Sequence, residues 1–253
     1  MAALMFYQEP TALDKKKHID LKLNRTSDYS FASGVNSVPL GGVEFFHASR
    51  DFPILFIKNE KGEYLPMAIL SLKSDSHDLG DDWKEAYIPA FIRRYPFAMT
   101  SERVIMFDAK APHFESNEGE ALFEGEDKPT ETLKQIVGFL EQIDLGFRRT
   151  EDFSKALGEK ELFEPYNATV KFKNGEVKMN DLFCINEKKL HEALDKDELQ
   201  EWFNKGWIAW CHAHLHSLSS MPEIIKRQRK TLEEPGQPEE APAEETKAEE
   251  TKA

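Results

Sequence analysis

The sequence has little cysteine, no excess of basic charge and no long hydrophobic run. Only Cys184 and Cys211 are present, and they form no CxxC pair. A disulfide framework and a zinc knuckle are therefore disfavoured, and a reducing compartment is the simpler expectation. No segment approaches the roughly 20 apolar residues of a membrane span, and the start from Met1 to Tyr7 lacks the basic region of a secretory signal. We expect a cytoplasmic protein without a membrane span.

The net charge of −13 is spread unevenly along the chain. From Glu233 to Ala253 there are eight Glu and two Lys, which gives this segment a net charge of −6 and leaves −7 for residues 1–232. Binding to nucleic acid depends on a basic face that neutralises phosphates. The balance of charge therefore predicts that nucleic acid is not a partner.

The end of the chain differs in composition from the rest. It contains three prolines and the sequence Ala-Glu-Glu-Thr-Lys twice, at 243–247 and 248–252. Such a segment cannot bury apolar surface, so we predict a disordered acidic tail over 233–253. It either solvates the protein or docks on a basic partner. Residues 1–232 are predicted to form the globular region, with the possibility of two subdomains that meet near 115–130.

The globular region is predicted to have an α+β fold built from antiparallel hairpins with packed helices. A hydrophobic content of 40%, with 18 Phe, is enough for a sizeable core. Apolar runs on both sides of turn-forming residues predict hairpins, and the Asn174-Gly175 pair favours a type I′ turn in the last of them. The predicted hairpins pair residues 52–57 with 64–72, 97–99 with 104–107, and 169–172 with 176–179.

Helical periodicity begins after Pro129. Apolar residues from Leu133 to Ile143 are spaced by three and four, with Thr130 as a plausible cap. A second helix is predicted to begin at Thr150-Glu-Asp and to end near Gly158.

The C-terminal segment is also predicted to be helical. Leu182 to Ile185 suggests a short strand, after which Asn186 is expected to cap a helix over 187–194. Asp195 or Asp197 is expected to open a further helix, and Gly206 marks its end or a bend.

The densest aromatic and basic segment is Tyr87-Ile-Pro-Ala-Phe-Ile-Arg-Arg-Tyr-Pro-Phe97. Its two prolines are expected to start and to stop a short helix. Phe91 and Tyr95 share one face of that helix, whereas Arg93 and Arg94 point elsewhere and differ from one another by about 100°. The guanidinium groups either clamp a carboxylate or phosphate, or bond the chain's own carbonyls or carboxylates. The candidate carboxylates are those of Asp81, Asp82 and Asp108.

Three segments together make the chain resemble the SapC family of bacterial proteins, named from surface-layer gene clusters. They are the segment from Tyr87 to Phe97, Asn36-Ser-Val-Pro-Leu40 upstream, and Ala213-His-Leu215 with Ser217-Leu218 downstream. The resemblance covers about residues 10–225 and implies a cytoplasmic protein associated with surface-layer or export gene clusters. It implies action by binding, and it brings no catalytic residues. An unrelated peptide-transport permease shares the name, but the permease interpretation fails here for want of a membrane span.

A histidine cluster raises the question of a metal site. His212, His214 and His216 lie within a segment of helical character, where His214 points about 200° away from the other two. We therefore predict no metal site and no cofactor. A buried His214 that bonds a backbone carbonyl is the ordinary alternative.

A nucleophilic site is a second alternative. Ser37, Ser217 and Cys211 are the imaginable nucleophiles, with His214 as base and Asp108 or Asp181 as the orienting acid. No nucleophile-elbow motif supports such an arrangement. An enzyme, a hydrolase or transferase, stays the alternative to a binding protein.

The binding hypothesis predicts an exposed groove that holds a protein or peptide partner, or a small acidic ligand. A buried His214 beside a solvent-facing arginine would favour binding, whereas a His214 open to a cavity near Ser37 or Ser217 would favour catalysis. The candidate ligand-binding residues are Tyr87, Phe91, Arg93, Arg94, Tyr95 and His214.

Overall fold

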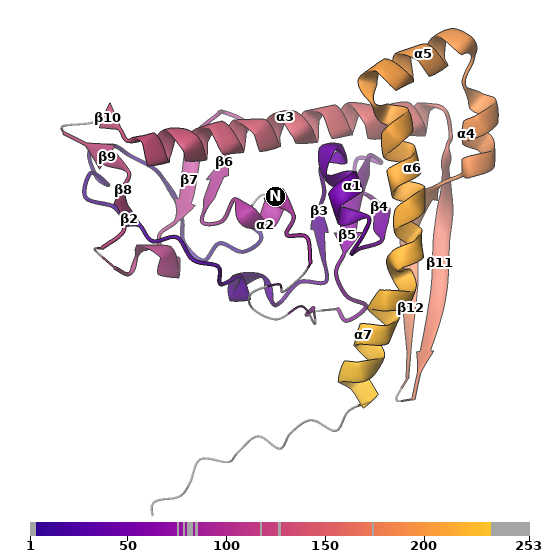
Figure 1. Ribbon diagram of the computed structural model, residues 1–253, viewed down its shortest axis with the longest axis horizontal. Coiled ribbons are helices and arrows are strands. Elements are labelled where there is room, and N and C mark those ends of the chain that lie inside the picture. The colour runs from indigo at the N-terminus through magenta and orange to yellow at the C-terminus, as the bar shows by residue number, and fades with distance from the viewer. Residues whose placement is uncertain are drawn as a thin grey trace, which may run out of the picture.

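The computed structural model describes residues 4–74, 76–77, 79, 83, 86–116, 118–125, 128–173 and 175–233 (Figure 1). The predicted acidic tail beyond Glu233 lies outside these residues, as do Asp81 and Asp82. The described residues form an α+β fold of antiparallel sheets and packed helices, which confirms the fold class expected from the sequence. None of the described helices combines the length and the apolar character needed to cross a membrane.

The largest sheet has five antiparallel strands in the order β11-β12-β4-β5-β3. Strands β4 (Ile54–Lys58) and β5 (Tyr64–Ile69) form the first predicted hairpin, and β3 (Ser37–Pro39) pairs with the other edge of β5. The side chains of Ile54, Leu55 and Phe56 are all fully buried. The strand is apolar at every position before Lys58, and its first three residues are thus covered on both faces.

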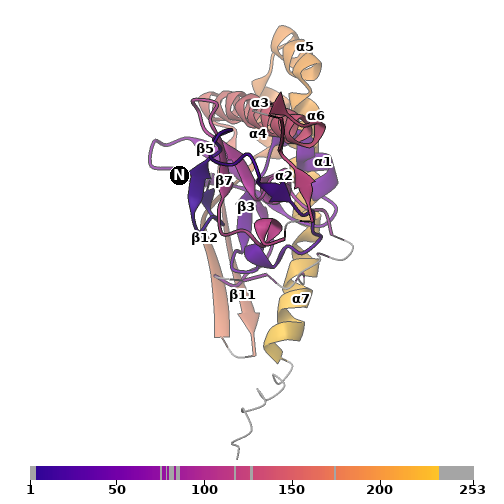
Figure 2. The same ribbon diagram turned by 90° about the vertical axis from the view of Figure 1, so that its left-hand side faces the viewer.

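Strands β11 (Phe163–Phe172) and β12 (Gly175–Ile185) form a hairpin much longer than the one predicted. The expected short strand over Leu182–Ile185 is the end of β12, where it pairs with β4. Gly175 has a φ of 149°, a conformation that favours glycine, while Asn174 lies outside the described residues. Both views show the hairpin projecting beyond the other strands, beside α7 (Figures 1 and 2).

A smaller sheet contains β1 (Pro10–Ala12), β7 (Ile105–Asp108) and β6 (Phe97–Met99). The β6–β7 pairing confirms the second predicted hairpin. Two short ladders lie apart from the larger sheets, and they pair β2 (Lys22–Leu23) with β8 (Glu120–Ala121), and β9 (Phe123–Glu124) with β10 (Lys128–Pro129).

Helix α3 runs without interruption from Glu131 to Glu159. Its predicted cap is confirmed, because the Thr130 hydroxyl accepts a hydrogen bond from the Leu133 amide. The prediction of a separate helix from Thr150 is wrong. Thr150 resembles a cap in sequence, but its hydroxyl donates to the Gly146 carbonyl at 2.6 Å, one turn earlier in the same helix. A threonine that bonds back in this way lies inside a helix.

Two hydrophobic clusters lie under α3, and the helix belongs to both. The larger cluster surrounds the five-stranded sheet and includes Phe153 and Leu157 of α3. The smaller cluster fills the space beside the three-stranded sheet and includes Leu133 and Leu140 of the same helix. Figure 1 shows α3 extending along both parts. A subdomain boundary near 115–130 stays a prediction.

The C-terminal helices confirm their predicted caps. Asn186 accepts from the Lys189 amide at the start of α4 (Glu187–Ala193), and Asp195 caps α5 (Lys196–Lys205). Gly206 ends α5 with a φ of 78°. Helix α6 (Trp207–Ser217) packs on the five-stranded sheet and α7 (Met221–Glu233) follows it. The remaining short elements are η2 (Ser30–Ala32), η3 (Gly42–Glu44), α1 (Phe45–Ala48), α2 (Ala90–Arg93), η4 (Pro112–Phe114) and η5 (Leu218–Ser220).

Candidate functional site

The short helix α2 is held at its start by the buried carboxylate of Glu44. Pro89 precedes the helix, so the first free amide is that of Ala90, which donates to Glu44 Oε1 at 2.7 Å. The Tyr87 hydroxyl donates to the same oxygen at 2.8 Å, and the Gly41 amide donates to Oε2 at 3.2 Å. Burial and the neighbouring carboxylate raise the pKa of Tyr87 to about 12. Glu44 therefore fixes the position of both α2 and Tyr87.

Arg93 is exposed but held in one orientation. Its Nε donates to the Ile88 carbonyl at 2.8 Å, and its Nη2 lies 3.4 Å from the Tyr87 hydroxyl and 4.0 Å from Glu44 Oε1. The guanidinium lies 5.3 Å from the centre of the Phe139 ring, within the range of a cation–π interaction. Its side chain keeps 39% of its surface in contact with solvent. Arg93 is thus an oriented cation that a ligand is able to reach.

Arg94 occupies a different environment, as the 100° offset between neighbouring helical residues predicts. It is only 9% exposed, and its guanidinium carbon lies 4.0 Å from the centre of the Phe91 ring. Burial lowers the pKa of Arg94, and the nearby Tyr7 acts in the opposite direction. An arginine nevertheless stays protonated in proteins. Arg94 is therefore a buried cation stacked on an aromatic ring.

Asp108 anchors the next part of the segment. The amides of Gln8 and Glu9 and the Tyr95 hydroxyl each donate to its carboxylate at 2.9 Å. Burial would raise the pKa of Asp108, but these hydrogen bonds outweigh it and the pKa is lowered. Arg94 and Asp108, both described, form no ion pair with each other, so the pairing considered from the sequence is not what holds this carboxylate in place.

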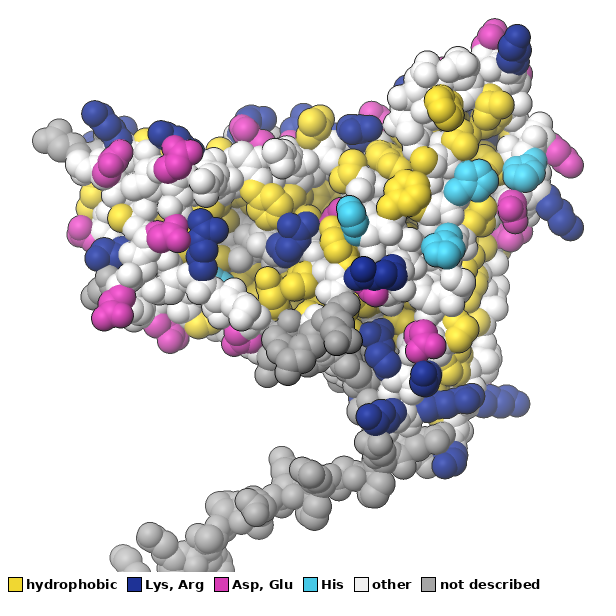
Figure 3. Space-filling model, viewed as in Figure 1, with side chains coloured by type: hydrophobic (Ala, Val, Ile, Leu, Met, Phe, Trp, Pro, Cys, Tyr) yellow, Lys and Arg dark blue, Asp and Glu magenta, His cyan; other side chains and the backbone are white. Residues whose placement is uncertain are grey.

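A groove of about 460 Å³ opens beside α3, where both arginines meet residues from distant parts of the chain. We call it the arginine groove. Among the described residues its lining includes three arginines and no Asp or Glu. Figure 3 shows Lys and Arg side chains beside hydrophobic ones on the face below α3. The polar and aromatic lining residues are Arg25, Thr26, Tyr29, Arg93, Arg94, Tyr95, Phe97, His113, Gln135 and Phe139.

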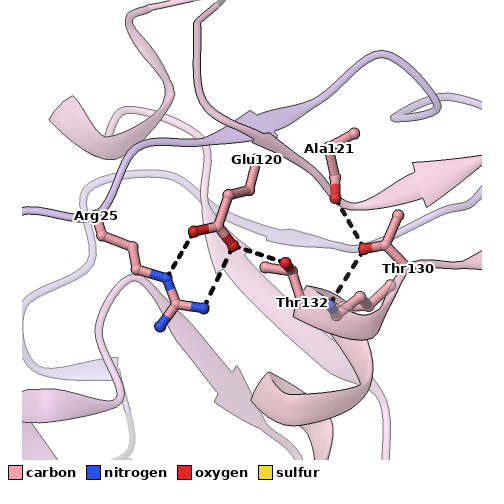
Figure 4. A network of polar contacts seen from close by, with 6 residues as sticks. Arg25, Glu120, Ala121, Thr130 and Thr132 are labelled. Carbon is pink, nitrogen blue, oxygen red and sulfur yellow. Dashed lines mark hydrogen bonds and ion pairs between the residues drawn. The ribbon is translucent and has the colours of Figure 1, made fainter.

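The third arginine, Arg25, is oriented by a fork of two hydrogen bonds (Figure 4). Its Nε and Nη2 donate to the two oxygens of Glu120 at 3.1 and 3.3 Å, and the Thr132 hydroxyl donates to Glu120 Oε2 at 2.6 Å. The paired geometry restricts the guanidinium plane. Because Thr132 belongs to the first turn of α3, the network also ties Arg25 to the helix that forms one side of the groove.

His113 lies in the wall of the same groove. It is 7% exposed, and its Nδ1 atom has no hydrogen-bond partner among the described residues. Burial lowers the pKa of His113, with Asp28 acting in the opposite direction. A neutral imidazole at pH 7 offers one donor and one acceptor. The groove therefore combines oriented cations with a neutral polar group.

A family model described as SapC matches residues 13–224. The chain belongs to the SapC family. The matched range contains every described residue that lines the arginine groove. No curated protein and no protein of known structure matches the chain.

The predicted site residues of this SapC family member do not all meet. Arg93, Arg94 and Tyr95 line the arginine groove, whereas Phe91 lies against Arg94 and Tyr87 against Glu44, and neither of these two lines it. His214 lies elsewhere, fully buried in α6. A ligand-binding role for these residues stays a prediction.

His214 is buried, as expected, and its Nε2 atom bonds a backbone amide. That atom accepts a hydrogen bond from the Ile185 amide at 3.0 Å, so it carries no proton. Burial lowers the pKa of His214 to about 3, and the Ile54 backbone acts in the opposite direction. The Ser217 hydroxyl donates to the His214 carbonyl rather than to its ring. His214 thus joins α6 to the sheet.

Other residues considered for metal binding or nucleophilic catalysis lie on the same helix, α6. His212 and His216 are both exposed, whereas His214 is buried. Among the described residues, no three His, Cys, Asp or Glu side chains cluster so that they could hold a metal ion. Burial raises the pKa of Cys211 to about 12, which disfavours the nucleophilic thiolate.

Several groove residues are absent from the sequence prediction. Arg25, Tyr29, His113 and Gln135 lie far from the arginine pair in the chain, and no local pattern links them to it. Glu44 is one of 46 acidic residues, so only its contacts with Tyr87 and Ala90 single it out. Only their contacts and positions in the folded chain identify these residues as part of the site.

Proposed function

We propose that this SapC family member is a binding protein whose arginine groove receives the anionic group of its ligand. The single observation that carries the proposal is the meeting of Arg25, Arg93 and Arg94 in one groove whose described lining contains no carboxylate. Guanidinium groups recognise carboxylates and phosphates through paired hydrogen bonds, and the enclosing aromatic residues reduce competition from water. The ligand is a protein or peptide partner with an acidic group, or a small acidic molecule.

The pre-set orientation of the cations supports binding at this groove. Arg93 is held by Ile88 and Tyr87, and Arg25 by Glu120, before any ligand arrives. Residues already fixed in their bound orientation lose less conformational entropy when a ligand binds. Tyr95 and Phe97 add apolar surface on one wall. We therefore expect recognition of a ligand in which an anionic group adjoins an apolar or aromatic one.

The enzyme alternative has weaker support. Catalysis by His214 would need an imidazole that is open to a cavity and within reach of a nucleophile. The ring is instead fully buried and accepts a backbone hydrogen bond, while Arg93 faces solvent beside Phe139. This combination favours the binding hypothesis over a hydrolase or transferase.

The cellular role follows from the family alone. We infer that the protein acts in the bacterial cytoplasm as an accessory factor in the export or assembly of surface-layer proteins. Family membership supports this inference. Capture of partners by the intact protein, compared with capture by Arg93→Gln, tests it. Loss of a surface-layer or export component from the captured set of the variant is the expected result.

Binding at the groove is tested directly by isothermal titration with two probes, inorganic phosphate and an acetylated, amidated tetraglutamate peptide. Arg93→Gln is expected to weaken the binding of at least one probe about tenfold, as the loss of a charge-assisted hydrogen bond would. Arg103→Gln is the matched control, because Arg103 is exposed and pairs with Glu141 outside the groove. Equal weakening by both variants would mean that only net charge matters, and would contradict the proposal.

A further inference from the structure

A second hollow lies along the C-terminal half of α3, between that helix and the β4–β5 turn. It has a volume of about 880 Å³, and we call it the acidic cavity. Glu63 projects from the turn side, and Glu151 and Asp152 project from α3. Lysines and two aromatic residues complete the lining. The residues used below are Lys58, Lys61, Glu63, Tyr64, Glu151, Asp152, Ser154, Lys155, Glu159, Glu161, Phe163 and Lys189.

The carboxylates of Glu63 and Asp152 repel that of Glu151, and the nearby Arg148 offsets part of this repulsion. Within the described part of the chain, none of the three carboxylates forms an ion pair. Glu63 accepts a hydrogen bond from the Asn59 amide group at 2.8 Å, which is a neutral donor. Burial and then the charges of Glu63 and Asp152 raise the pKa of Glu151. A positive charge placed among these carboxylates would relieve the repulsion.

Three of the four lysines that line the cavity are engaged by other groups of its wall, and the fourth, Lys61, is exposed on the turn. Lys155 pairs with Glu159 at 3.8 Å, Lys189 donates to the Glu161 carbonyl at 3.1 Å, and Lys58 lies 5.1 Å from the centre of the Tyr64 ring. These three ammonium groups therefore form no ion pair with Glu63, Glu151 or Asp152.

Ser154 supplies an observation independent of the acidic residues. Its side chain belongs to the cavity lining, yet the residue is only 2% exposed, and its Oγ has no hydrogen-bond partner among the described residues. Buried hydroxyl groups nearly always have a partner, and an unsatisfied one costs free energy. A ligand donor that enters the cavity beside Glu151 would satisfy this oxygen.

The chemistry of the lining selects an organic cation over a metal ion. In the part of the chain that the structure describes, no three acidic, His or Cys side chains converge closely enough to hold a metal. Tyr64 stacks on Phe163 with ring centres 3.9 Å apart and gives the cavity an apolar surface. Such a surface suits methylene groups that carry an ammonium.

We propose that the acidic cavity is a binding site for an alkylammonium group, supplied either by a polyamine or by a lysine side chain of a peptide. The ammonium lies between Glu63 and Glu151 and donates one hydrogen bond to Ser154 Oγ. Its methylene chain lies along Tyr64 and Phe163. This site is separate from the arginine groove and shares no lining residue with it.

The test is isothermal titration of the full chain with spermidine and with an acetylated, amidated trilysine peptide at near-physiological ionic strength. Saturable binding of at least one probe is expected. Binding of spermidine alone identifies the polyamine as the source, binding of the peptide alone identifies the lysine side chain, and competition between the two identifies the shared ammonium. Absence of saturable binding for both probes would overturn the proposal.

Variants separate a site from general attraction to an acidic protein. The double variant Glu63→Gln, Glu151→Gln is expected to weaken binding at least tenfold, because two charge-assisted contacts are lost. Glu102→Gln, Glu118→Gln is the matched control, since both residues are exposed and lie outside the cavity. Binding by the control is expected to stay within twofold of the parent. Equal losses in the two double variants would overturn the proposal.

Ser154→Ala tests the hydroxyl separately. A loss of about threefold to tenfold in affinity is expected for one hydrogen bond. Circular dichroism spectra and thermal midpoints show whether each variant is folded. An unchanged affinity in a folded Ser154→Ala would overturn the assignment of the ammonium to this position. Titration of the same variants with phosphate and tetraglutamate measures anion binding in the arginine groove. The result for the acidic cavity is thereby kept separate from the result for the groove.

Discussion

The two hollows beside α3 hold their charges in different ways. In the arginine groove, Arg94 is buried against Phe91, and Arg93 and Arg25 are oriented by hydrogen bonds to Ile88 and Glu120. In the acidic cavity, Glu151 and Asp152 lie on the surface of α3 and Glu63 lies beside a turn, and these three carboxylates form no ion pair among the described residues.

The two hollows therefore differ in how far their charged side chains are fixed before a ligand binds. Cations that packing holds in place lose little freedom on binding, whereas exposed charges are screened by salt and lose side-chain entropy when they are ordered. We therefore expect binding in the arginine groove to depend on ligand shape and to resist salt. Binding in the acidic cavity is expected to weaken more as the salt concentration rises. The predictions below test how firmly each region is held.

The largest effect is expected for Asp108→Ala. The side chain accepts hydrogen bonds from the three backbone amides of Gln8, Glu9 and Lys110, and from Tyr95, which lines the arginine groove. Loss of these charge-assisted bonds is expected to lower the free energy of unfolding by about 3 to 5 kcal/mol. Urea denaturation measures it. A loss below about 1 kcal/mol would mean that this wall of the groove is not anchored here.

The second prediction compares cations of the two hollows. Arg94→Ala is expected to cost about 2 to 4 kcal/mol of unfolding free energy, because it removes a buried side chain stacked on Phe91. Lys155→Ala removes an exposed ion pair with Glu159 and is expected to cost less than about 0.5 kcal/mol. Arg93→Ala should fall between them. Equal urea midpoints for the Arg94 and Lys155 variants would contradict the expected difference in stability between losing a buried and losing an exposed cation.

The third prediction concerns pH and a residue in neither hollow. The folded-state pKa of His214 is lowered to about 3 from 6.5. Between these two pH values the unfolded chain therefore binds a proton at His214 that the folded chain does not bind. Stability is therefore complete above pH 6.5 and falls as the pH decreases, by about 2 kcal/mol at pH 5. Unfolding free energies at pH 7 and pH 5 measure it. The exposed His212→Gln should keep this dependence, whereas His214→Gln should lose it.

A smaller effect is expected for the hydrogen bond that joins Thr150 of α3 to Gly42 of η3. The Thr150 hydroxyl donates to the Gly146 carbonyl and accepts from the Gly42 amide at 2.8 Å. Thr150→Val leaves that buried amide without its partner and is expected to cost about 1 to 3 kcal/mol. Thr150→Ser retains the hydroxyl and serves as the control. Indistinguishable urea midpoints for the two variants would show that the hydrogen bond contributes nothing.

The smallest effect is expected for truncation after Leu232. Composition predicts that the removed segment buries no apolar surface, so the thermal midpoint should stay nearly unchanged. Differential scanning calorimetry of the two chains provides the comparison. A drop of several degrees would show that the acidic segment docks, and the arginine groove would then be the first place to look for it.

Local features of the fold were predictable, whereas the joining of distant residues was not. The caps at Thr130 and Asn186 act within one helical turn, so sequence alone located them, and it narrowed the cap of α5 to Asp195 or Asp197. Thr150 was misleading because the same hydroxyl is able to cap a new helix or to bond back within an existing one. Only its tertiary contact with Gly42 distinguishes the two.

The candidate site was predictable to a smaller extent. The difference between Arg93 and Arg94 follows from helical geometry, and the structure confirms it with one exposed and one buried guanidinium. The third arginine was not foreseen. Arg25 reaches the groove because β2 pairs with β8, a contact between residues almost a hundred positions apart. Such short ladders have too few residues to leave a recognisable pattern.

Helix α3 affects how the protein unfolds. It spans 29 residues, and side chains from its two halves are packed into two different hydrophobic clusters. At 1.5 Å per residue it is a rod about 44 Å long. Unfolding of either hydrophobic cluster removes apolar contacts from α3, and the remaining cluster also depends on that helix for its packing. Hydrogen exchange of the amides along α3 should therefore report one opening free energy from end to end, and the chain should denature in a single cooperative transition.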